Sequence, residues 1–255
     1  MAHYSELHFV DLLARHFPRH FRGARVLEVG SLDINGSIRK FFVDCDYVGL
    51  DVAPGKGVDV VCEGQKYDAP DDSYDVVISC EAMEHNPHWI ATFQNMIRLC
   101  RPSGLVVMTC ATVGRPEHGT TRTEPESSPL TVGLGWDYYK NLREKDFRSR
   151  VDLSALTLNR FWVRWHHFDL LFMGIKGRDD TPSPLASAWT AAVDAIDRWI
   201  GEDSAVRALR YRARFASCFG DAWFNVMRRL TLRTHSLVWL MDRLHVPHNE
   251  DSVKR

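Results

Sequence analysis

The stretch RVLEVG at residues 25–30 is a short apolar run that ends in a glycine. Such a run is typical of a buried β-strand, and a glycine directly after it lets the backbone turn sharply and approach a ligand. Four further apolar runs follow, at 47–51, 58–62, 74–79 and 104–109. They do not alternate strictly between apolar and polar residues, which is typical of strands covered on both faces. The pattern therefore predicts an α/β fold with a doubly wound, mostly parallel sheet.

Helices are predicted between these strands. The apolar spacing favours an amphipathic helix over 5–17, and a second helix is expected to be capped by Asn86, with Pro87 in its first turn and its end before Arg101. The segment 111–136 is rich in Gly, Pro, Thr, Ser and Glu. It is too long and too polar for a plain connection, so a lid loop is expected there.

The chain is predicted to have two parts. Residues 1–177 form the α/β domain, with a helical stretch at 137–150 and two more strand-like runs within 161–176. Residues 178–255 form a helical extension, in which the apolar stripe over 223–244 has nearly heptad spacing. This stripe suits packing on the domain or on a second subunit of a homodimer, and peripheral contact with a membrane is the alternative.

Composition and charge narrow the class of protein. The chain has 255 residues, of which 45% are hydrophobic and 25% charged, an ordinary globular composition. The 32 Lys and Arg are balanced by 33 Asp and Glu, so no global positive charge favours a nucleic acid partner. The six cysteines are scattered and no apolar run reaches the ~18 residues of a transmembrane helix. We therefore expect a cytoplasmic protein with reduced thiols and no transmembrane segment.

Candidate ligand-binding residues lie at or just after the predicted strand ends. The carboxyl ends of parallel strands share one edge of a sheet, so these residues are expected to line one site. Asp51 ends the second run, where its carboxylate can accept the hydroxyl hydrogens of a ribose. The candidates for cofactor binding are Glu28, Gly30, Ser31, Asn35, Asp51, Glu63, Gly64, Cys80 and Glu81.

Four segments carry a resemblance to a known family. They are VLEVGS at 26–31, YVGLD at 47–51, YDVVISCEAMEH at 74–85 and RPSGLVVMT at 101–109, within the region 25–175. In order and spacing they resemble the class I S-adenosylmethionine-dependent methyltransferases. The resemblance implies a seven-stranded sheet whose last two strands form an antiparallel hairpin. It also implies S-adenosylmethionine as cofactor and S-adenosylhomocysteine as product, with the methionine portion held at Glu28 and Gly30 and the ribose at Asp51.

The turn after the first strand departs from the pattern of that family. Instead of glycines at alternate positions it has the bulkier Ser31, Leu32 and Ile34, and flexible residues come only at Asn35 and Gly36. The fingerprint GxGxxG is also absent, which weakens the alternative of an NAD-dependent oxidoreductase. A second alternative is a non-catalytic partner or scaffold protein built on the same fold.

Two histidines are candidates for the catalytic base. Methyl transfer requires alignment of the nucleophile, the methyl carbon and the sulfur, and also a base when the nucleophile is a hydroxyl. His118 is the first candidate because it lies on the predicted lid, where a solvated loop histidine is the alternative. His85 is the second because it follows the fourth strand, where a structural role together with Glu84 is the alternative.

No metal site is predicted from the sequence. Glu81, His85 and His88 have a spacing that suggests a helical zinc site, but Pro87 breaks the helical register, so this site is rejected. Magnesium, which some sugar and catechol methyltransferases use, remains an alternative without support from the sequence.

The acceptor is expected to be a small hydroxylated molecule. The lid is polar and Thr-rich and carries His118 and Arg122, and Tyr138 and Tyr139 follow it, where they either wall a substrate pocket or make a simple helix contact. The balanced charge argues against a nucleic acid substrate. The whole sequence resembles methyltransferases associated with glycan or natural-product assembly. That resemblance implies O-methylation of a sugar or a glycosylated small molecule.

Overall fold

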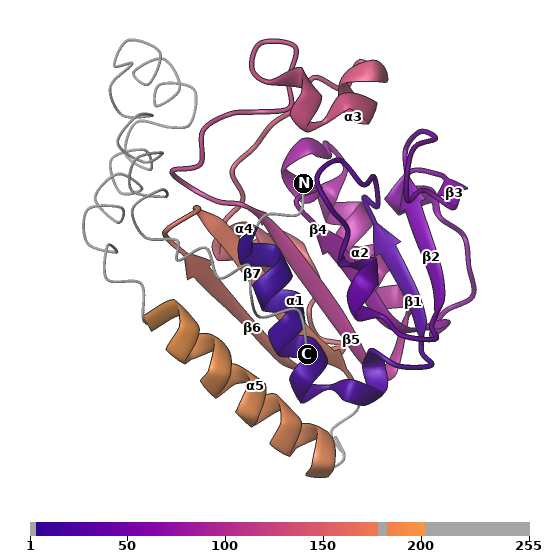
Figure 1. Ribbon diagram of the computed structural model, residues 1–255, viewed down its shortest axis with the longest axis vertical. Coiled ribbons are helices and arrows are strands. Elements are labelled where there is room, and N and C mark those ends of the chain that lie inside the picture. Colours follow the sequence, from indigo (N-terminus) through magenta and orange to yellow (C-terminus); the bar gives the residue numbers. More distant parts are fainter. Residues whose placement is uncertain (1–3, 178–182, 202–255) are drawn as a thin grey trace, which may run out of the picture.

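The computed structural model describes residues 4–177 and 183–201 and shows helices on both sides of one twisted sheet (Figure 1). The strands are β1 (Arg25–Val29), β2 (Asp46–Asp51), β3 (Val60–Val61), β4 (Tyr74–Cys80), β5 (Cys100–Ala111), β6 (Leu156–Arg164) and β7 (Asp169–Lys176). The α-helices are α1 (Tyr4–His16), α2 (Trp89–Leu99), α3 (Pro129–Gly133), α4 (Glu144–Arg150) and α5 (Ser183–Gly201). Short 3₁₀ turns lie at Pro18–His20, Ile38–Phe41, Gly64–Lys66, Met83–His85 and Pro125–Ser127.

The sheet has seven strands in the order β3-β2-β1-β4-β5-β7-β6. Strands β3, β2, β1, β4 and β5 pair in parallel, and β7 lies antiparallel between β5 and β6. The order reverses at β1, next to β4, and in open α/β sheets ligands bind beyond the carboxyl ends of the strands at such a point. The predictions of a mostly parallel seven-stranded sheet and of a final antiparallel hairpin are confirmed.

The two faces of the sheet are covered by different helices (Figure 1). On one face Phe93 of α2 and Phe147 of α4 lie with their ring centroids 5.0 Å apart, in one buried cluster with Phe172 of β7. On the other face α1 and α5 contribute Phe9 and Ile196 to a second cluster. This double cover explains why the central strands are apolar on both sides.

Two helix boundaries predicted from the sequence are wrong. Helix α2 begins at Trp89 rather than directly after Asn86, because the Asn86 side chain accepts a hydrogen bond from the His88 amide (2.7 Å) and closes a separate turn before the helix. Only the second half of 137–150 is helical. Helix α4 starts after Arg143, where the Asp146 carboxylate accepts from the Arg143 amide (2.9 Å).

Helix α5 packs on the α/β domain through α1. His8 and Trp199 have ring centroids 4.8 Å apart, and the α5 carboxylate of Asp197 accepts hydrogen bonds from Arg160 and Trp162 of β6, each 2.9 Å long. The rest of the predicted helical extension, including the stripe over 223–244, lies outside the described residues. Among the residues that the structure describes, no helix combines the length and the apolar character needed to cross a bilayer.

Candidate active site

A cavity lies beyond the carboxyl ends of β1, β2 and β4, with about 420 Å³ of space, part of which is open solvent. Its lining residues are Gly30, Leu32, Ile34, Asp51, Cys80, Glu81, Ala82, His85, Ser127, Ser128, Pro129, Leu130 and Thr131. The first eight come from the strand ends and the loops at the sheet edge, where the sequence placed Gly30, Asp51, Cys80 and Glu81. The segment 127–131, which opens α3, forms the opposite wall.

The backbone turn at Gly30 requires a glycine. Its φ is +84°, which L-residues rarely adopt, and a Cβ built on Gly30 would lie only 2.4 Å from the Cβ of Ala82. The Gly30 amide donates to the Leu50 carbonyl (2.8 Å), which holds the turn against β2. The loops that follow β1 and β4 therefore approach each other closely at the floor of the cavity.

Asp51 is oriented by two backbone amides. One carboxylate oxygen accepts from Leu32 (3.0 Å) and the other from Val52 (2.7 Å). Burial raises the pKa of Asp51 above its usual range, and the two amide hydrogen bonds oppose that rise. The carboxylate is thus fixed at the cavity wall at the end of β2, where the sequence analysis placed the ribose site.

Glu28 faces a different cavity from Asp51. Its side chain is 6% exposed and accepts a hydrogen bond from the Tyr47 hydroxyl (2.7 Å). It lines a second small cavity together with Ser31, on the other side of the turn at 30–32, and the two cavities share Gly30, Leu32 and Cys80. Burial raises the pKa of Glu28 to about 7, although the hydrogen bond from Tyr47 opposes the rise.

The Glu28→Gln variant is expected to lose much of the pH dependence of stability. In the wild type, Glu28 stays protonated in the folded state up to about pH 7, whereas its ordinary pKa is 4.5. The contribution of Glu28 to the free energy of unfolding is therefore fully present below pH 4.5. It falls by about 3 kcal/mol as the pH rises from 4.5 through 7. Urea unfolding at pH 5 and pH 8 should show a smaller decrease for Glu28→Gln. In the Tyr47→Phe control, which keeps the carboxyl group, the decrease should persist; equal decreases in Glu28→Gln and wild type would contradict the prediction.

Five of the predicted cofactor residues do not line the cavity that contains Asp51: Glu28 and Ser31 line the second cavity, and Asn35, Glu63 and Gly64 line neither. Asn35 is exposed on the loop after β1. Glu63 accepts hydrogen bonds from Gln65 (2.6 Å) and Lys66 (2.5 Å), and the Gly64 carbonyl accepts from Asn95 of α2 (2.8 Å). The turn after β3 is therefore held by hydrogen bonds between its own side chains and by one from α2. A direct role of Asn35, Glu63 and Gly64 in cofactor binding remains a prediction.

The two candidate histidines lie together beside the cavity. His85 and His118 are 3% and 7% exposed, and their ring centroids are 4.9 Å apart with the planes at 83°. Tyr139 packs against both imidazoles, at 5.0 Å from His118 and 5.6 Å from His85. His118 Nδ1 lies 3.0 Å from the Pro116 carbonyl oxygen. Because that oxygen can only accept, Nδ1 carries a hydrogen, and in the neutral imidazole Nε2 then carries the lone pair.

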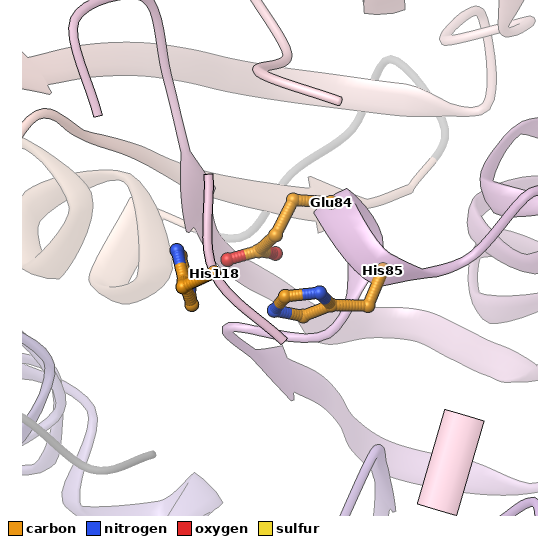
Figure 2. A group of neighbouring side chains, drawn as sticks. All are labelled: Glu84, His85 and His118. Atoms are coloured by element: carbon orange, nitrogen blue, oxygen red, sulfur yellow. The ribbon is translucent and has the colours of Figure 1, made fainter. Parts of the chain in front are cut away.

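His85 is held in its neutral form. Burial lowers its pKa well below the ordinary value, and the neighbouring His118 lowers it further. The carboxylate of Glu84 lies between the two imidazoles (Figure 2). One oxygen of Glu84 accepts from the Ala111 amide (3.1 Å), which anchors the side chain at the end of β5.

Buried acidic groups surround this pair of imidazoles. Glu81 follows β4 with a φ of +51°, and both of its carboxylate oxygens are buried without a hydrogen-bond partner among the described residues. Burial raises the pKa of Glu81 well above its usual range, and the charges of Glu6, Glu84 and Asp169 add to the rise. Arg115 opposes it from an ion pair with Asp169 (3.1 Å).

Arg115 and the wall at 127–131 were not predicted individually, although both fall within the predicted lid loop 111–136. Both lie on the long polar segment between β5 and α4, whose path cannot be read from periodicity because it has no regular spacing of apolar residues. The available signal for Arg115 was its position, three residues before the candidate base His118.

Comparisons with a family model and with solved structures agree with the α/β fold described above. Residues 1–123 match the family model described as a methyltransferase domain. Phosphoethanolamine N-methyltransferase 2 of Haemonchus contortus, in complex with phosphomonomethylethanolamine and S-adenosylhomocysteine, has a TM-score of 0.50 and 14% identity, over 67% of this chain and 52% of that one. For the 1,6-didemethyltoxoflavin-N1-methyltransferase of Burkholderia thailandensis the values are 0.46 and 13%, over 67% and 77%. No curated protein sequence matches the chain.

The sheet order, the cavity at its carboxyl edge and the match of residues 1–123 to a methyltransferase domain are consistent with a class I S-adenosylmethionine-dependent methyltransferase, and the predicted fold is confirmed. The matched segment ends at residue 123, so it contains Gly30, Asp51, Glu81, His85 and His118. The chain spans about half the length of the Haemonchus contortus enzyme.

Proposed function

We propose that the protein transfers a methyl group from S-adenosylmethionine to a hydroxyl group of a small molecule, a sugar or a glycosylated metabolite. The observation that carries the proposal is that one cavity joins Gly30 and Asp51 to His85, which is in ring contact with His118. A place for a nucleoside and a pair of buried bases therefore lie side by side.

The reaction is an in-line displacement. The acceptor oxygen attacks the methyl carbon, the new C–O bond forms as the C–S bond breaks, and both electrons of that bond stay on sulfur. The product is neutral S-adenosylhomocysteine. The hydroxyl proton passes to Nε2 of His118, which carries a lone pair because Nδ1 donates to Pro116.

Charge in the cavity supports a cationic cofactor. The Glu81 carboxyl group lines the cavity without a hydrogen-bond partner among the described residues, in a region where further acids lie nearby. A sulfonium that arrives next to Glu81 favours the ionised carboxylate and is itself favoured by it. When the methyl group leaves, that positive charge disappears from sulfur, so the attraction is weaker for the product.

A hydroxyl acceptor is supported by the neutral imidazole of His85, because a base without its own proton is required to take one from an alcohol. A small acceptor is supported by the wall at 127–131, which faces Gly30 and Asp51 across the cavity. The Haemonchus contortus relative is named as an N-methyltransferase, so amines are included in the acceptor screen below.

The proposal is tested by calorimetry with S-adenosylmethionine, S-adenosylhomocysteine and NAD, followed by a screen for methyl transfer. We expect binding of the first two and no heat from NAD. Incubation with cofactor bearing a trideuterated methyl group should then label alcohols of a metabolite extract rather than amines. Binding of NAD without binding of S-adenosylhomocysteine would establish the oxidoreductase alternative, and cofactor binding without any labelled acceptor would favour the scaffold protein.

The Asp51→Ala variant is expected to bind S-adenosylhomocysteine about 10- to 150-fold more weakly, a loss of ~1.5–3 kcal/mol for hydrogen bonds to a charged acceptor. The matched control is Asp33→Ala. Asp33 lies on the loop after β1, next to the Leu32 amide that donates to Asp51; it pairs with Lys56 (2.7 Å), accepts from the Gly36 amide (2.8 Å) and does not line the cavity. Calorimetry should show nearly unchanged affinity for the control; equal losses in the two variants would remove Asp51 from the cofactor site.

A further inference from the structure

Glu84, His85 and His118 form a compact cluster of ligand atoms. One carboxylate oxygen and one nitrogen from each imidazole all lie within 4.8 Å of one another, and all three side chains are buried. Figure 2 shows the three groups pointing toward one another, Glu84 and His85 from the turn after β4 and His118 from the segment after β5. We propose that this cluster binds a divalent transition-metal ion and that the ion holds the acceptor oxygen.

The two histidines have features that are typical of metal-binding histidines. A metal binds a nitrogen of the neutral imidazole, and each of the two histidines offers one ring nitrogen to the cluster. The Nδ1 atom of His118 lies 3.0 Å from the Pro116 carbonyl oxygen and donates a hydrogen bond to it, which orients the ring. Metal-binding histidines almost always donate their other nitrogen to a carbonyl or carboxylate in this way, since that bond fixes the tautomer and the ring orientation.

Unsatisfied polar atoms in the cluster are the second and independent observation. His85 Nδ1 and one oxygen of Glu84 are both fully buried and have no hydrogen-bond partner among the described residues. The other oxygen of Glu84 is held by the Ala111 amide, so the carboxylate is oriented while one ligand atom stays available. Buried polar atoms without partners cost stability, and an ion between them would satisfy both.

The electrostatic surroundings also favour a cation. The acids Glu6, Glu81 and Asp169 influence the same region as Glu84, and the cation that opposes them is Arg115, already paired with Asp169. Glu81 lines the cavity with His85, and neither of its oxygens has a hydrogen-bond partner within the described part of the chain. A divalent ion at the cluster would stabilise the ionised form of these buried carboxyl groups, which burial alone disfavours.

The donor set selects the kind of ion. Two imidazoles and one carboxylate suit Mn²⁺, Fe²⁺, Co²⁺ or Zn²⁺, whereas Mg²⁺ and Ca²⁺ prefer oxygen ligands throughout. Three protein ligands leave coordination positions open, as in catalytic rather than structural metal sites. Those positions are available to oxygen atoms of an acceptor.

The role of the ion in activating the acceptor rests on the proposed methyl transfer, whereas binding of the ion does not. A bound cation lowers the pKa of a coordinated hydroxyl, so the acceptor gives its proton to water as it binds. The resulting alkoxide attacks the methyl carbon, the C–O bond forms, and the electrons of the broken C–S bond stay on sulfur. When the metal is bound, the lone pair of His118 Nε2 coordinates the ion. The acceptor proton then goes to water instead of to His118.

The test is a titration of the chelator-treated full chain with Co²⁺, followed by visible absorption. We expect one equivalent to bind with a d–d spectrum of mixed nitrogen and oxygen ligation and to raise the melting temperature. Glu84→Gln and His118→Ala should weaken Co²⁺ binding at least 100-fold. The matched control is His88→Ala, because His88 is exposed, three residues from His85, and lies outside the cluster.

The outcomes separate the metal site from the methyl transfer. The metal proposal is overturned if Co²⁺ does not bind, or if it binds equally to wild type and to Glu84→Gln, a variant that keeps an acceptor for Ala111. It is also overturned if the chelated protein transfers methyl groups at the full rate, a result that leaves the proposed function standing with His118 as the base. Stoichiometric Co²⁺ binding at the cluster without S-adenosylhomocysteine binding would support the site and contradict the function.

Discussion

The His118→Ala variant is expected to lower the turnover number by roughly 10²- to 10⁴-fold, the usual contribution of a positioned acid or base. His118 contacts His85 and Tyr139 beside the cavity but does not line the part that holds Gly30 and Asp51. The affinity for S-adenosylhomocysteine should therefore change by less than about two-fold, well within the energy of one weak hydrogen bond. Steady-state kinetics and calorimetry on the same preparation measure the two quantities.

The control for His118→Ala is Arg122→Ala on the same segment. Arg122 is half exposed and forms ion pairs with Glu117 and Asp137, both 2.9 Å long, so its loss perturbs the segment without touching the imidazoles. We expect this control to keep most of the turnover. If the two variants lose activity equally, the effect comes from the path of the segment; if His118→Ala retains full turnover, His118 has no part in the chemistry.

The Gly30→Ala variant is expected to lose both stability and cofactor binding. The positive φ costs an L-residue about 1–2 kcal/mol, and the overlap with the Ala82 Cβ adds about 1–3 kcal/mol, so the free energy of unfolding should fall by about 2–5 kcal/mol. Relief of the overlap separates the loops after β1 and β4, which form the floor of the cavity. Affinity for S-adenosylhomocysteine should fall more than about ten-fold, as expected when at least one hydrogen bond to the ligand is lost. Chemical unfolding and calorimetry test both effects.

Gly23 provides a matched control for the conformational part of this effect. It has a φ of +62°, but a Cβ at this position meets nothing within 4 Å. Gly23→Ala should therefore cost only the ~1–2 kcal/mol of the left-handed backbone and should leave cofactor affinity unchanged. Equal destabilisation by Gly23→Ala and Gly30→Ala would show that the contact with Ala82 relaxes at no cost.

The strands could be predicted because their signal is local. A run such as 25–30 is apolar on both faces, and a glycine ends it where the chain must turn. The shared edge of the parallel strands then brings Gly30, Asp51 and Glu81 to one cavity, which follows from topology alone. The start of α2 was misplaced because the side chain of Asn86 closes a turn of its own before the helix.

The rest of the candidate site depends on contacts between distant residues. Nothing in the local sequence shows that the turn at 30–32 separates Glu28 from Asp51. The contact between His85 and His118 likewise depends on how a long polar segment folds back over the sheet edge. Its path is set by the Tyr139 ring and by hydrogen bonds such as that from His118 to Pro116, and side-chain contacts of this kind leave no periodic pattern.

The packing of α5 on α1 has a consequence for synthesis on the ribosome. Helix α1 is made early, yet the apolar cluster that contains Phe9 is completed only by Ile196, and Asp197 fastens α5 to β6. While the intervening residues are translated, part of this apolar surface faces water or a chaperone. The nascent domain therefore closes late, after a helix that lies beyond its last strand has emerged.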